Sequence, residues 1–257
     1  MRLTVLGTSA SCAGPGQACA GHFLQAAGAR VLFDCGNGVL SNLAQLEDPT
    51  ALDAVFLTHN HPDHYADLYC LQALVRYAPA GPAGPIPLYV PGDLFGRAQC
   101  LLSERGAREF REAFVPVQLV DGQSVSIGEL TVTPFEVPHT APTYALRAEC
   151  AGTSLCYTSD TAPGERALRA ARGVDLLLAE ATLPEQYSGA APHMTASEAG
   201  ALGREAGARA MALVHIWPTN DRELMARLAS EAFGSAVLVA EEFDEYDITP
   251  VNGRDDS

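Results

Sequence analysis

The sequence of 257 residues contains no lysine, so arginine carries all 16 of its basic charges. Against these stand 31 acidic residues, which give a formal net charge of -15. Proteins that bind long nucleic acids depend on basic patches, and this balance therefore argues against such a partner. A small anionic substrate stays compatible with the charge, because bound metal ions dominate the local field of their site.

Long apolar runs are also absent. No run approaches the roughly 18 to 20 residues that a membrane-spanning helix needs. The N-terminus, Met1 to Gly7, reaches a glycine without the apolar core of a signal peptide. We therefore expect a soluble, cytoplasmic protein without a membrane partner. The seven cysteines are odd in number and irregularly spaced, which indicates reduced residues rather than a disulfide framework.

One short segment concentrates side chains that bind metals. Residues 58–64 read Thr-His-Asn-His-Pro-Asp-His and follow the apolar stretch 54–57, which has the pattern of a buried strand. Zinc takes histidine nitrogen and carboxylate oxygen in sites that stay open to water. Ligand-type side chains this close together can supply half of each of two neighbouring metal sites, and a solvated polar loop is the less favoured interpretation. These side chains are His59, His61, Asp63 and His64.

The spacing His-x-His-x-Asp-His after a strand that ends in threonine resembles the signature of the metallo-β-lactamase superfamily. The resemblance implies an α/β protein built as a four-layer αββα sandwich, with two divalent metal ions and a hydrolytic activity. Zinc is the expected metal, while manganese and iron suit the same ligand types. We expect one domain over residues 1–257, with a mobile acidic tail near 250–257.

Three single residues match the remaining metal positions of that superfamily. His139 matches the histidine that completes the first site beside His59 and His61, and His215 matches the last ligand of the second site beside Asp63 and His64. Asp160 matches the aspartate that bridges the two metals. On its own, Asp160 also suits a turn or helix cap before Pro163. His22, alone on an expected strand, is interpreted as structural.

Two further segments resemble ribonuclease Z. Residues 178–182, Leu-Ala-Glu-Ala-Thr, resemble its His-Glu-Ala-Thr element, with Ala179 in place of the histidine, and residues 192–195, Pro-His-Met-Thr, resemble its His-x-Thr element. The resemblance implies that His193 is a general acid for the leaving oxygen and that Glu180 holds its tautomer. It also implies that Asp63 orients the attacking hydroxide. His193 has a structural interpretation as well, at the start of a helix that a capping box would begin.

The combined motifs resemble the ribonuclease Z-like branch of the superfamily, and within it small cyclic-nucleotide phosphodiesterases. The basic, Gly/Pro-rich insertion of a tRNA-binding arm is not seen in the sequence, so ribonuclease Z-like RNA processing is the less favoured function. A small phosphodiester such as cyclic AMP is the implied substrate. The sequence departs from the common pattern at Asn60, where bulkier residues are frequent, and at Ser159, where glycine is usual.

Other functions keep part of this site. A lactone, thioester or β-lactam hydrolase of a biosynthetic pathway would use the same metals and would not need His193. Iron–oxygen or sulfur chemistry is disfavoured, because diiron relatives carry glutamate where this chain has His61. A binding module that has lost catalysis would lack a ligand, whereas every ligand position is filled here.

The sequence also raises two questions, namely which surface could form a homodimer and which arginine could hold a phosphate. The apolar stretch 68–77 is a candidate homodimer surface. Four arginines are equal candidates for holding a phosphate: Arg147, Arg166, Arg204 and Arg209.

Apolar periodicity predicts the order of the elements. Strands are expected at 2–6, 22–25, 30–33, 54–57, 88–90, 115–119, 125–127, 130–134, 144–149, 155–158, 175–179, 211–214 and 237–239. Helices are expected at 39–46, 65–77, one or two within 92–114, and at 163–172, 195–206 and 221–233. A surface loop is expected at 79–87.

Overall fold

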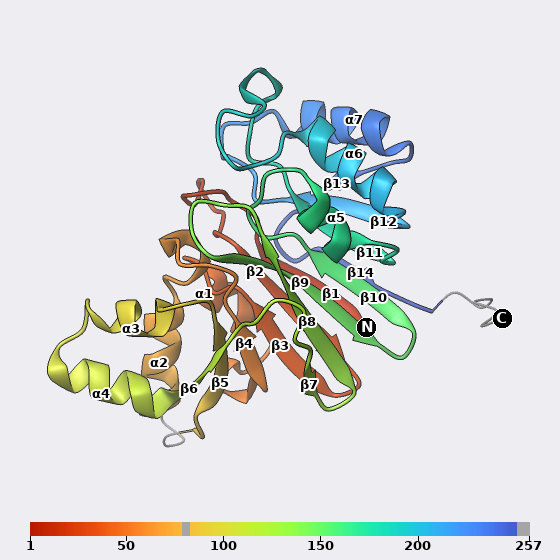
Figure 1. The fold of residues 1–257 in the computed structure, drawn as a ribbon. Helices are drawn as coiled ribbons and strands as arrows, with labels where there is room; N and C mark the ends of the chain where they lie inside the picture. The colour runs from red at the N-terminus through yellow and green to blue at the C-terminus, as the bar shows by residue number, and fades with distance from the viewer. Residues whose placement is uncertain (79–82, 251–257) are drawn as a thin grey trace.

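The computed structural model describes residues 1–78 and 83–250, and its strands form two sheets of seven strands each (Figure 1). The first sheet contains β1 (Arg2–Gly7), β2 (Gly21–Ala26), β3 (Ala29–Phe33), β4 (Ala54–Phe56), β5 (Ile86–Val90), β6 (Phe114–Gln118) and β14 (Glu245–Asp247). The second contains β7 (Val125–Ile127), β8 (Leu130–Val137), β9 (Thr143–Cys150), β10 (Thr153–Tyr157), β11 (Leu176–Glu180), β12 (Ala210–Val214) and β13 (Leu238–Val239).

Seven α-helices accompany the sheets within the described ranges. They are α1 (Val39–Leu43), α2 (Leu68–Tyr77), α3 (Leu94–Gln99), α4 (Glu104–Ala113), α5 (Glu165–Ala171), α6 (Ala196–Ala206) and α7 (Arg222–Phe233). Three short 3₁₀ helices are η1 (Pro49–Ala51), η2 (Pro62–His64) and η3 (Glu185–Tyr187). In Figure 1, α3 and α4 extend away from the sheets.

Each sheet is antiparallel in one half and parallel in the other. The first sheet has the order β14-β1-β2-β3-β4-β5-β6, and its strands become parallel from β3 onward. The second has the order β13-β12-β11-β10-β9-β8-β7 and is parallel from β10 to β13. Because parallel strands end at the same edge, the loops after β3, β4, β10, β11 and β12 gather at one rim of the molecule.

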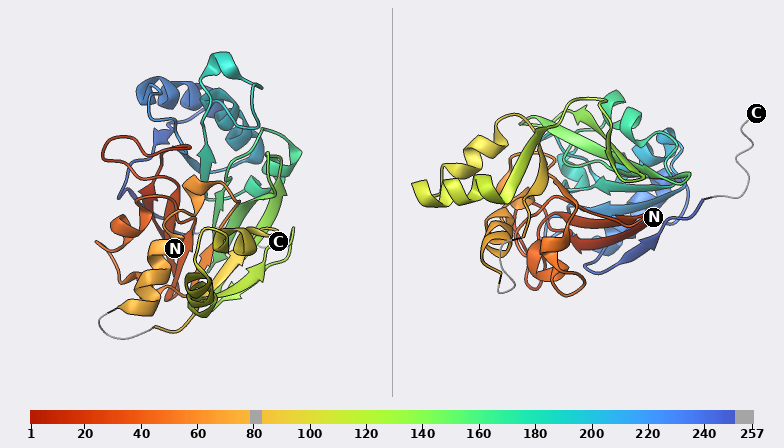
Figure 2. Two further views of the ribbon diagram at one scale, coloured as in Figure 1. Left: turned by 90° about the vertical axis from the view of Figure 1, so that its left-hand side faces the viewer. Right: turned by 90° about the horizontal axis from the view of Figure 1, so that it is seen from below.

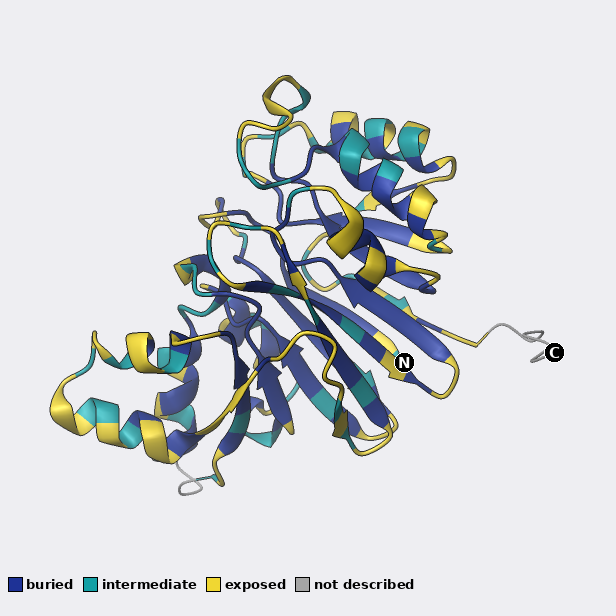
Figure 3. Cartoon of the chain, in the orientation of Figure 1, coloured by how far each residue is buried: buried dark blue, intermediate teal, exposed yellow. Residues whose placement is uncertain are grey.

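Three apolar cores separate four layers. Between the sheets, Phe33 and Phe56 of the first sheet share a core with Leu155 and Tyr157 of the second. The opposite face of the first sheet packs on α1 to α4, and that of the second sheet packs on α5 to α7. Figure 2 shows this stacking from two further directions, and Figure 3 shows the central strands buried while the outer faces of the helices are exposed. The expected α/β fold with an αββα sandwich is confirmed.

Local signals set several boundaries as predicted. The capping box of α6 forms, because the Thr195 side chain accepts a hydrogen bond from the Glu198 N–H while the Glu198 carboxylate accepts one from the Thr195 N–H. The helix ends at Gly207, whose φ of 69° is the left-handed conformation that glycine adopts without strain.

Three boundaries differ from the prediction by three residues, and several others differ by one or two. The helix expected at 65–77 begins at Leu68, because the Cys35 N–H binds the His64 carbonyl and the Asp67 N–H binds the Cys35 carbonyl, which holds the preceding turn out of the helix. The helix expected at 39–46 ends at Leu43, and Leu46 is exposed rather than in the core. The strand expected to stop at residue 134 continues to 137.

The acidic C-terminal region holds a strand that the sequence did not predict. β14 pairs antiparallel with β1, and Arg2 binds the Asp247 carboxylate at 2.9 Å. Its acidic side chains hide the strand pattern in the sequence. Of the expected surface loop at 79–87, residues 79–82 lie outside the described ranges, and so do residues 251–257 of the expected mobile tail. None of the helices in the described part of the chain is long and apolar enough to cross a membrane.

In the turn after β3, Gly36 is a position where an added side chain should destabilise the fold. A Cβ at Gly36 would overlap the carbonyl oxygens of Asp63 and Ala20, so Gly36→Ala must displace the loop that carries the histidine cluster. We expect a loss of about 1–3 kcal/mol in the free energy of unfolding, measured by denaturant titration. Gly84→Ala is the matched control, because a Cβ there meets nothing within 4 Å. Equal stability of the two variants would contradict this account.

Candidate metal centre

The predicted site residues come together at one rim of the sandwich, although they are spread over more than 150 positions of the chain. All of them except His193, which precedes α6, lie at or just after the carboxyl end of a strand. The segment His59 to His64 follows β4, His139 follows β8, Asp160 follows β10, Glu180 ends β11 and His215 follows β12.

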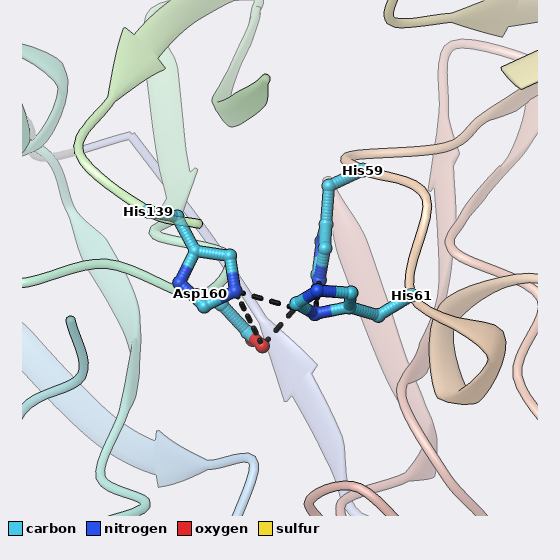
Figure 4. A group of neighbouring side chains, drawn as sticks. All are labelled: His59, His61, His139 and Asp160. Atoms are coloured by element: carbon cyan, nitrogen blue, oxygen red, sulfur yellow. Dashed lines mark hydrogen bonds and ion pairs between the residues drawn. The ribbon is translucent and has the colours of Figure 1, made fainter. Parts of the chain in front are cut away.

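One group consists of three histidines and one aspartate, shown in Figure 4. His59 Nε2 lies 3.0 Å from His61 Nδ1, which in turn lies 3.3 Å from His139 Nε2. Asp160 Oδ2 is 3.5 Å from His59 Nε2 and 3.9 Å from His139 Nε2. The four side chains therefore direct their donor atoms at one point.

A second group lies beside the first. His215 Nε2 is 3.2 Å from Asp63 Oδ2 and 3.2 Å from His64 Nε2. The other oxygen of the shared aspartate, Asp160 Oδ1, lies 3.4 Å from His64 Nε2. Asp160 therefore presents one oxygen to each group, which is the position that the sequence analysis assigned to a bridging ligand.

These distances suit metal ions better than hydrogen bonds alone. Ligands at about 2.0–2.1 Å from a tetrahedral zinc ion lie about 3.3 Å from one another. Asp160 Oδ1 is buried, and the described residues offer it no hydrogen-bond partner. Buried carboxylate oxygens are almost always satisfied in proteins. The donor set of imidazole nitrogen and carboxylate oxygen therefore fits divalent cations.

In the first group the protonation states also favour metal binding. Burial holds the pKa of His59 well below its usual range, and burial likewise lowers the pKa of His61 and of His139. Neutral imidazole is the form that binds a metal. Burial would raise the pKa of Asp160, but His215 and His64 outweigh it and hold that pKa well below its usual range. The carboxylate is therefore ionised.

The second group differs at His64. Burial would lower the pKa of His64, but Asp160 and Asp34 outweigh it and raise that pKa well above its usual value. His64 must therefore lose a proton before it binds an ion.

Each of the five histidines is oriented through its other ring nitrogen. Such contacts fix the tautomer and direction of a metal-binding imidazole. The partners are Thr58 Oγ1 for His59 at 3.1 Å, Thr140 Oγ1 for His61 at 3.3 Å, Asp34 Oδ2 for His64 at 2.8 Å, the Pro192 carbonyl for His139 at 3.1 Å and Thr182 Oγ1 for His215 at 2.8 Å.

Asp34 supports the metal loop from below. Its fully buried carboxylate accepts hydrogen bonds from the Thr58 N–H, the Thr58 hydroxyl and the Tyr157 hydroxyl, and it binds His64 Nδ1. The sequence analysis did not assign Asp34 a contact with any metal-facing residue. The available signal was the Asp-Cys-Gly turn at the end of β3, immediately before a helix.

His193 and Glu180 also meet, as the sequence analysis expected. His193 Nδ1 lies 2.8 Å from Glu180 Oε1, and the ring of His193 lies 4.9 Å from that of His139 and 5.9 Å from that of His215, between ring centres. Burial lowers the pKa of His193, but the hydrogen bond with Glu180 outweighs it and raises that pKa above its usual value. A partly exposed imidazole with a raised pKa thus stands beside both groups.

His22, interpreted as structural from the sequence, and the four arginine candidates lie outside the two groups. His22 is buried edge-on against the ring of Tyr157 and belongs to neither group. Within the described ranges, none of the four arginine candidates makes a hydrogen bond or ion pair with the cluster. Arg147 binds the carbonyls of residues 170 and 172, Arg166 pairs with Glu136, Arg209 pairs with Asp175, and Arg204 lies in the last turn of α6.

Comparison with known proteins gives a consistent set of relatives. A family model described as Beta-lactamase superfamily domain matches residues 29–216. The chain is 35% identical over 244 residues to Uncharacterized protein Rv1339 of Mycobacterium tuberculosis strain H37Rv, covering 92% of this chain and 88% of that protein. It is 28% identical over 308 positions to the ribonuclease Z of Natronomonas pharaonis, covering 96% of this chain and 98% of that protein.

A solved structure is similar over nearly the whole chain. The crystal structure of the metallo-beta-lactamase fold protein YhfI from Bacillus subtilis superposes with a TM-score of 0.85 at 26% identity, covering 95% of this chain and 98% of that one. In sequence, the probable metallo-hydrolase YhfI is 28% identical over 243 residues, covering 93% of this chain and 97% of that protein.

The role of Asp34 can be tested by removing its charge. Asp34→Asn keeps the size of the side chain but cannot accept hydrogen bonds from all of its present partners. We expect metal affinity to fall by about 10- to 100-fold, measured by competition with a chromophoric chelator. Asp48→Asn is the control, because Asp48 caps η1 at the surface and asparagine caps equally well. Unchanged affinity in Asp34→Asn would show that His64 is held by other contacts.

Proposed function

Because the chain belongs to the beta-lactamase superfamily, we propose that this metal-dependent hydrolase is a phosphodiesterase that cleaves a small phosphodiester such as a cyclic nucleotide. The single observation that carries the proposal is the contact between His193 and Glu180 at the edge of the metal-binding cluster. The family relatives support the reaction class, hydrolysis, whereas the contact between His193 and Glu180 supports the proposed substrate class, a phosphodiester.

We propose two divalent ions, with zinc as the first choice and manganese or iron as alternatives. His59, His61 and His139 would hold the first, and Asp63, His64 and His215 the second, with Asp160 between them. Two such ions would lower the pKa of a water molecule and polarise the phosphoryl oxygens of a substrate.

The residues around the ions have separate tasks. The Asp63 carboxylate accepts a hydrogen bond from the Ser11 N–H at 2.7 Å and faces His215, so it is held in place to orient a nucleophile. On the other side of the cluster, His193 directs Nδ1 to Glu180, which leaves Nε2 free to give a proton to a departing oxygen. Cleavage of a phosphodiester needs such a donor, because an alkoxide is a poor leaving group.

The size and charge of the molecule favour a small substrate. The net charge of -15 disfavours long RNA. The alignment with ribonuclease Z of Natronomonas pharaonis covers 308 positions, more than the 257 residues of this chain, so that relative carries segments that this chain lacks. RNA processing is therefore the second candidate, supported by the similarity itself, and lactone or thioester hydrolysis is the third.

Metal binding can be measured directly. The metal-free protein is expected to bind two zinc ions in a calorimetric titration, and His59→Ala to bind fewer. Each ion should stabilise the fold by about 2.7 kcal/mol when free zinc is a hundredfold above its Kd. The melting temperature should rise by about 2–4 °C for each kcal/mol. A single ion, or a titration that His59→Ala leaves unchanged, would contradict the proposed ligand set.

The general-acid role of His193 can be tested with 3′,5′-cyclic AMP. We expect His193→Ala to keep its metals and to lose about a hundredfold or more in turnover, because the leaving alkoxide is no longer protonated. Metal content and kcat are measured on the same preparation of each variant.

Thr195→Ala is the matched control for a purely structural role of the α6 start. It removes the helix cap at a cost of about 1 kcal/mol in stability and should retain turnover of the cyclic nucleotide. An equal loss in the two variants would assign His193 to helix structure. Hydrolysis of lactones or thioesters, with neither cyclic AMP nor bis-p-nitrophenyl phosphate cleaved, would replace the phosphodiester proposal while leaving the metal site intact.

A further inference from the structure

The hydroxyl of Thr182 lies between two groups with different proposed tasks. Thr182 Oγ1 is 2.8 Å from Glu180 Oε2 and 2.8 Å from His215 Nδ1. The side chain is buried, with 6% of its surface exposed, so water does not compete freely for these contacts. Glu180 also holds His193, through its other carboxylate oxygen.

The direction of each hydrogen bond follows from the chemistry of the partners. The ionised Glu180 carboxylate only accepts, so the Thr182 hydroxyl donates to it. The same hydroxyl oxygen then accepts from a proton on His215 Nδ1, which leaves His215 Nε2 free to face Asp63 and His64. His193 Nδ1 donates to the second Glu180 oxygen. Both histidines therefore donate toward Glu180, His193 directly and His215 through the Thr182 hydroxyl.

Two other atoms compete for these partners and are weaker alternatives. The His215 carbonyl lies 3.1 Å from the Thr182 hydroxyl, farther than the Glu180 carboxylate, and a charged acceptor forms the stronger bond. Asp160 Oδ1 lies 3.3 Å from His215 Nδ1. That distance exceeds the 2.8 Å to the Thr182 hydroxyl, and the proposed second ion would occupy the carboxylate oxygen.

A parallel contact exists on the first group. His139 Nδ1 binds the carbonyl of Pro192, the residue before His193. The segment that carries His193 is thus tied to a histidine of each group, through a backbone carbonyl in one case and through Thr182 and Glu180 in the other. The first tie can be removed only by changing the metal-facing His139, whereas the second can be removed at Thr182 without changing a proposed metal ligand.

The geometry points to Thr182 as a positioning residue that joins the metal-facing His215 and the proton-donating His193 into one hydrogen-bonded unit. This inference rests on the proposed function for the task of His193. It goes beyond that function, since it makes the strength of the second metal site and the placement of the general acid depend on one hydroxyl. Loss of the hydroxyl should weaken both.

The test compares Thr182→Val, which keeps the shape without the hydroxyl, with Thr182→Ser, which keeps the hydroxyl. Thr153→Val is the matched control. The buried Thr153 hydroxyl donates one hydrogen bond, to the Cys150 carbonyl, and it lies at the start of β10, whereas the metal cluster lies beyond the end of that strand. In zinc titrations, Thr182→Val should bind the second ion about 10- to 100-fold more weakly. Thr182→Ser and Thr153→Val should bind it as the wild type does.

A leaving-group comparison separates positioning from a general structural defect. A misplaced general acid matters for the alkoxide of cyclic AMP and little for p-nitrophenolate. With saturating zinc, Thr182→Val should therefore lose about tenfold in kcat on cyclic AMP and much less on bis-p-nitrophenyl phosphate. Thr182→Ser should restore the ratio. Equal losses on both substrates would overturn the inference.

A third measurement does not depend on any substrate. In the zinc-loaded protein with ¹⁵N-labelled histidine, Thr182→Val should shift the Nδ1 resonances of both His215 and His193, and Thr182→Ser should return them. A shift confined to His215 would overturn the coupling. If the wild type cleaves neither diester, the phosphodiester proposal fails, while the zinc titration and the resonances still decide whether Thr182 links the two histidines.

Discussion

The carboxylate of Asp34 is the contact on which the arrangement of the metal centre depends. It is fully buried, and a buried charge is tolerated only when it is well hydrogen-bonded. The partners of Asp34 are Thr58 and His64 in the metal loop and Tyr157 in the second sheet. One carboxylate thus contacts the metal loop, one imidazole and the second sheet, and it holds all three in register.

Three residues at this rim have a strained backbone conformation, which the surrounding contacts hold in place. Asp34, Ser159 and His215 have φ values of 58°, 53° and 53°, in the left-handed region that non-glycine residues avoid. Each such residue costs about 1–3 kcal/mol and persists only where surrounding contacts determine it. Glycine is usual at the position of Ser159 in the family that the motifs resemble. Glycine adopts this conformation without strain, so Ser159 carries a cost here that glycine would not.

The sequence could predict those parts of the structure that local patterns determine. Apolar periodicity predicts the order of strands and helices, and four metal-binding side chains in one short loop predict the cluster at 59–64. Apart from the contact between the neighbours Thr58 and His59, the contacts that orient the histidines could not be predicted, because they join positions far apart: Pro192 is 53 residues from His139, and Asp34 is 30 residues from His64. The four arginine candidates were indistinguishable for the same reason, since their carboxylate and carbonyl partners are set by tertiary structure. β14 was missed because its side chains are acidic and only its backbone pairing makes it a strand.

The position of the cluster between the sheets links the core to the chemistry. The segment from His59 to His64 moves with the first sheet, whereas His139, Asp160 and His215 move with the second. Between the two sheets these donor atoms are 3.2–3.5 Å apart, so any sliding of one sheet over the other would change the spacing that an ion requires. The apolar core between the sheets resists such sliding, because close-packed side chains interdigitate in discrete arrangements. Ions that bind across the sheets would in turn oppose their separation, so the packing of this core and the affinity of the site must depend on each other.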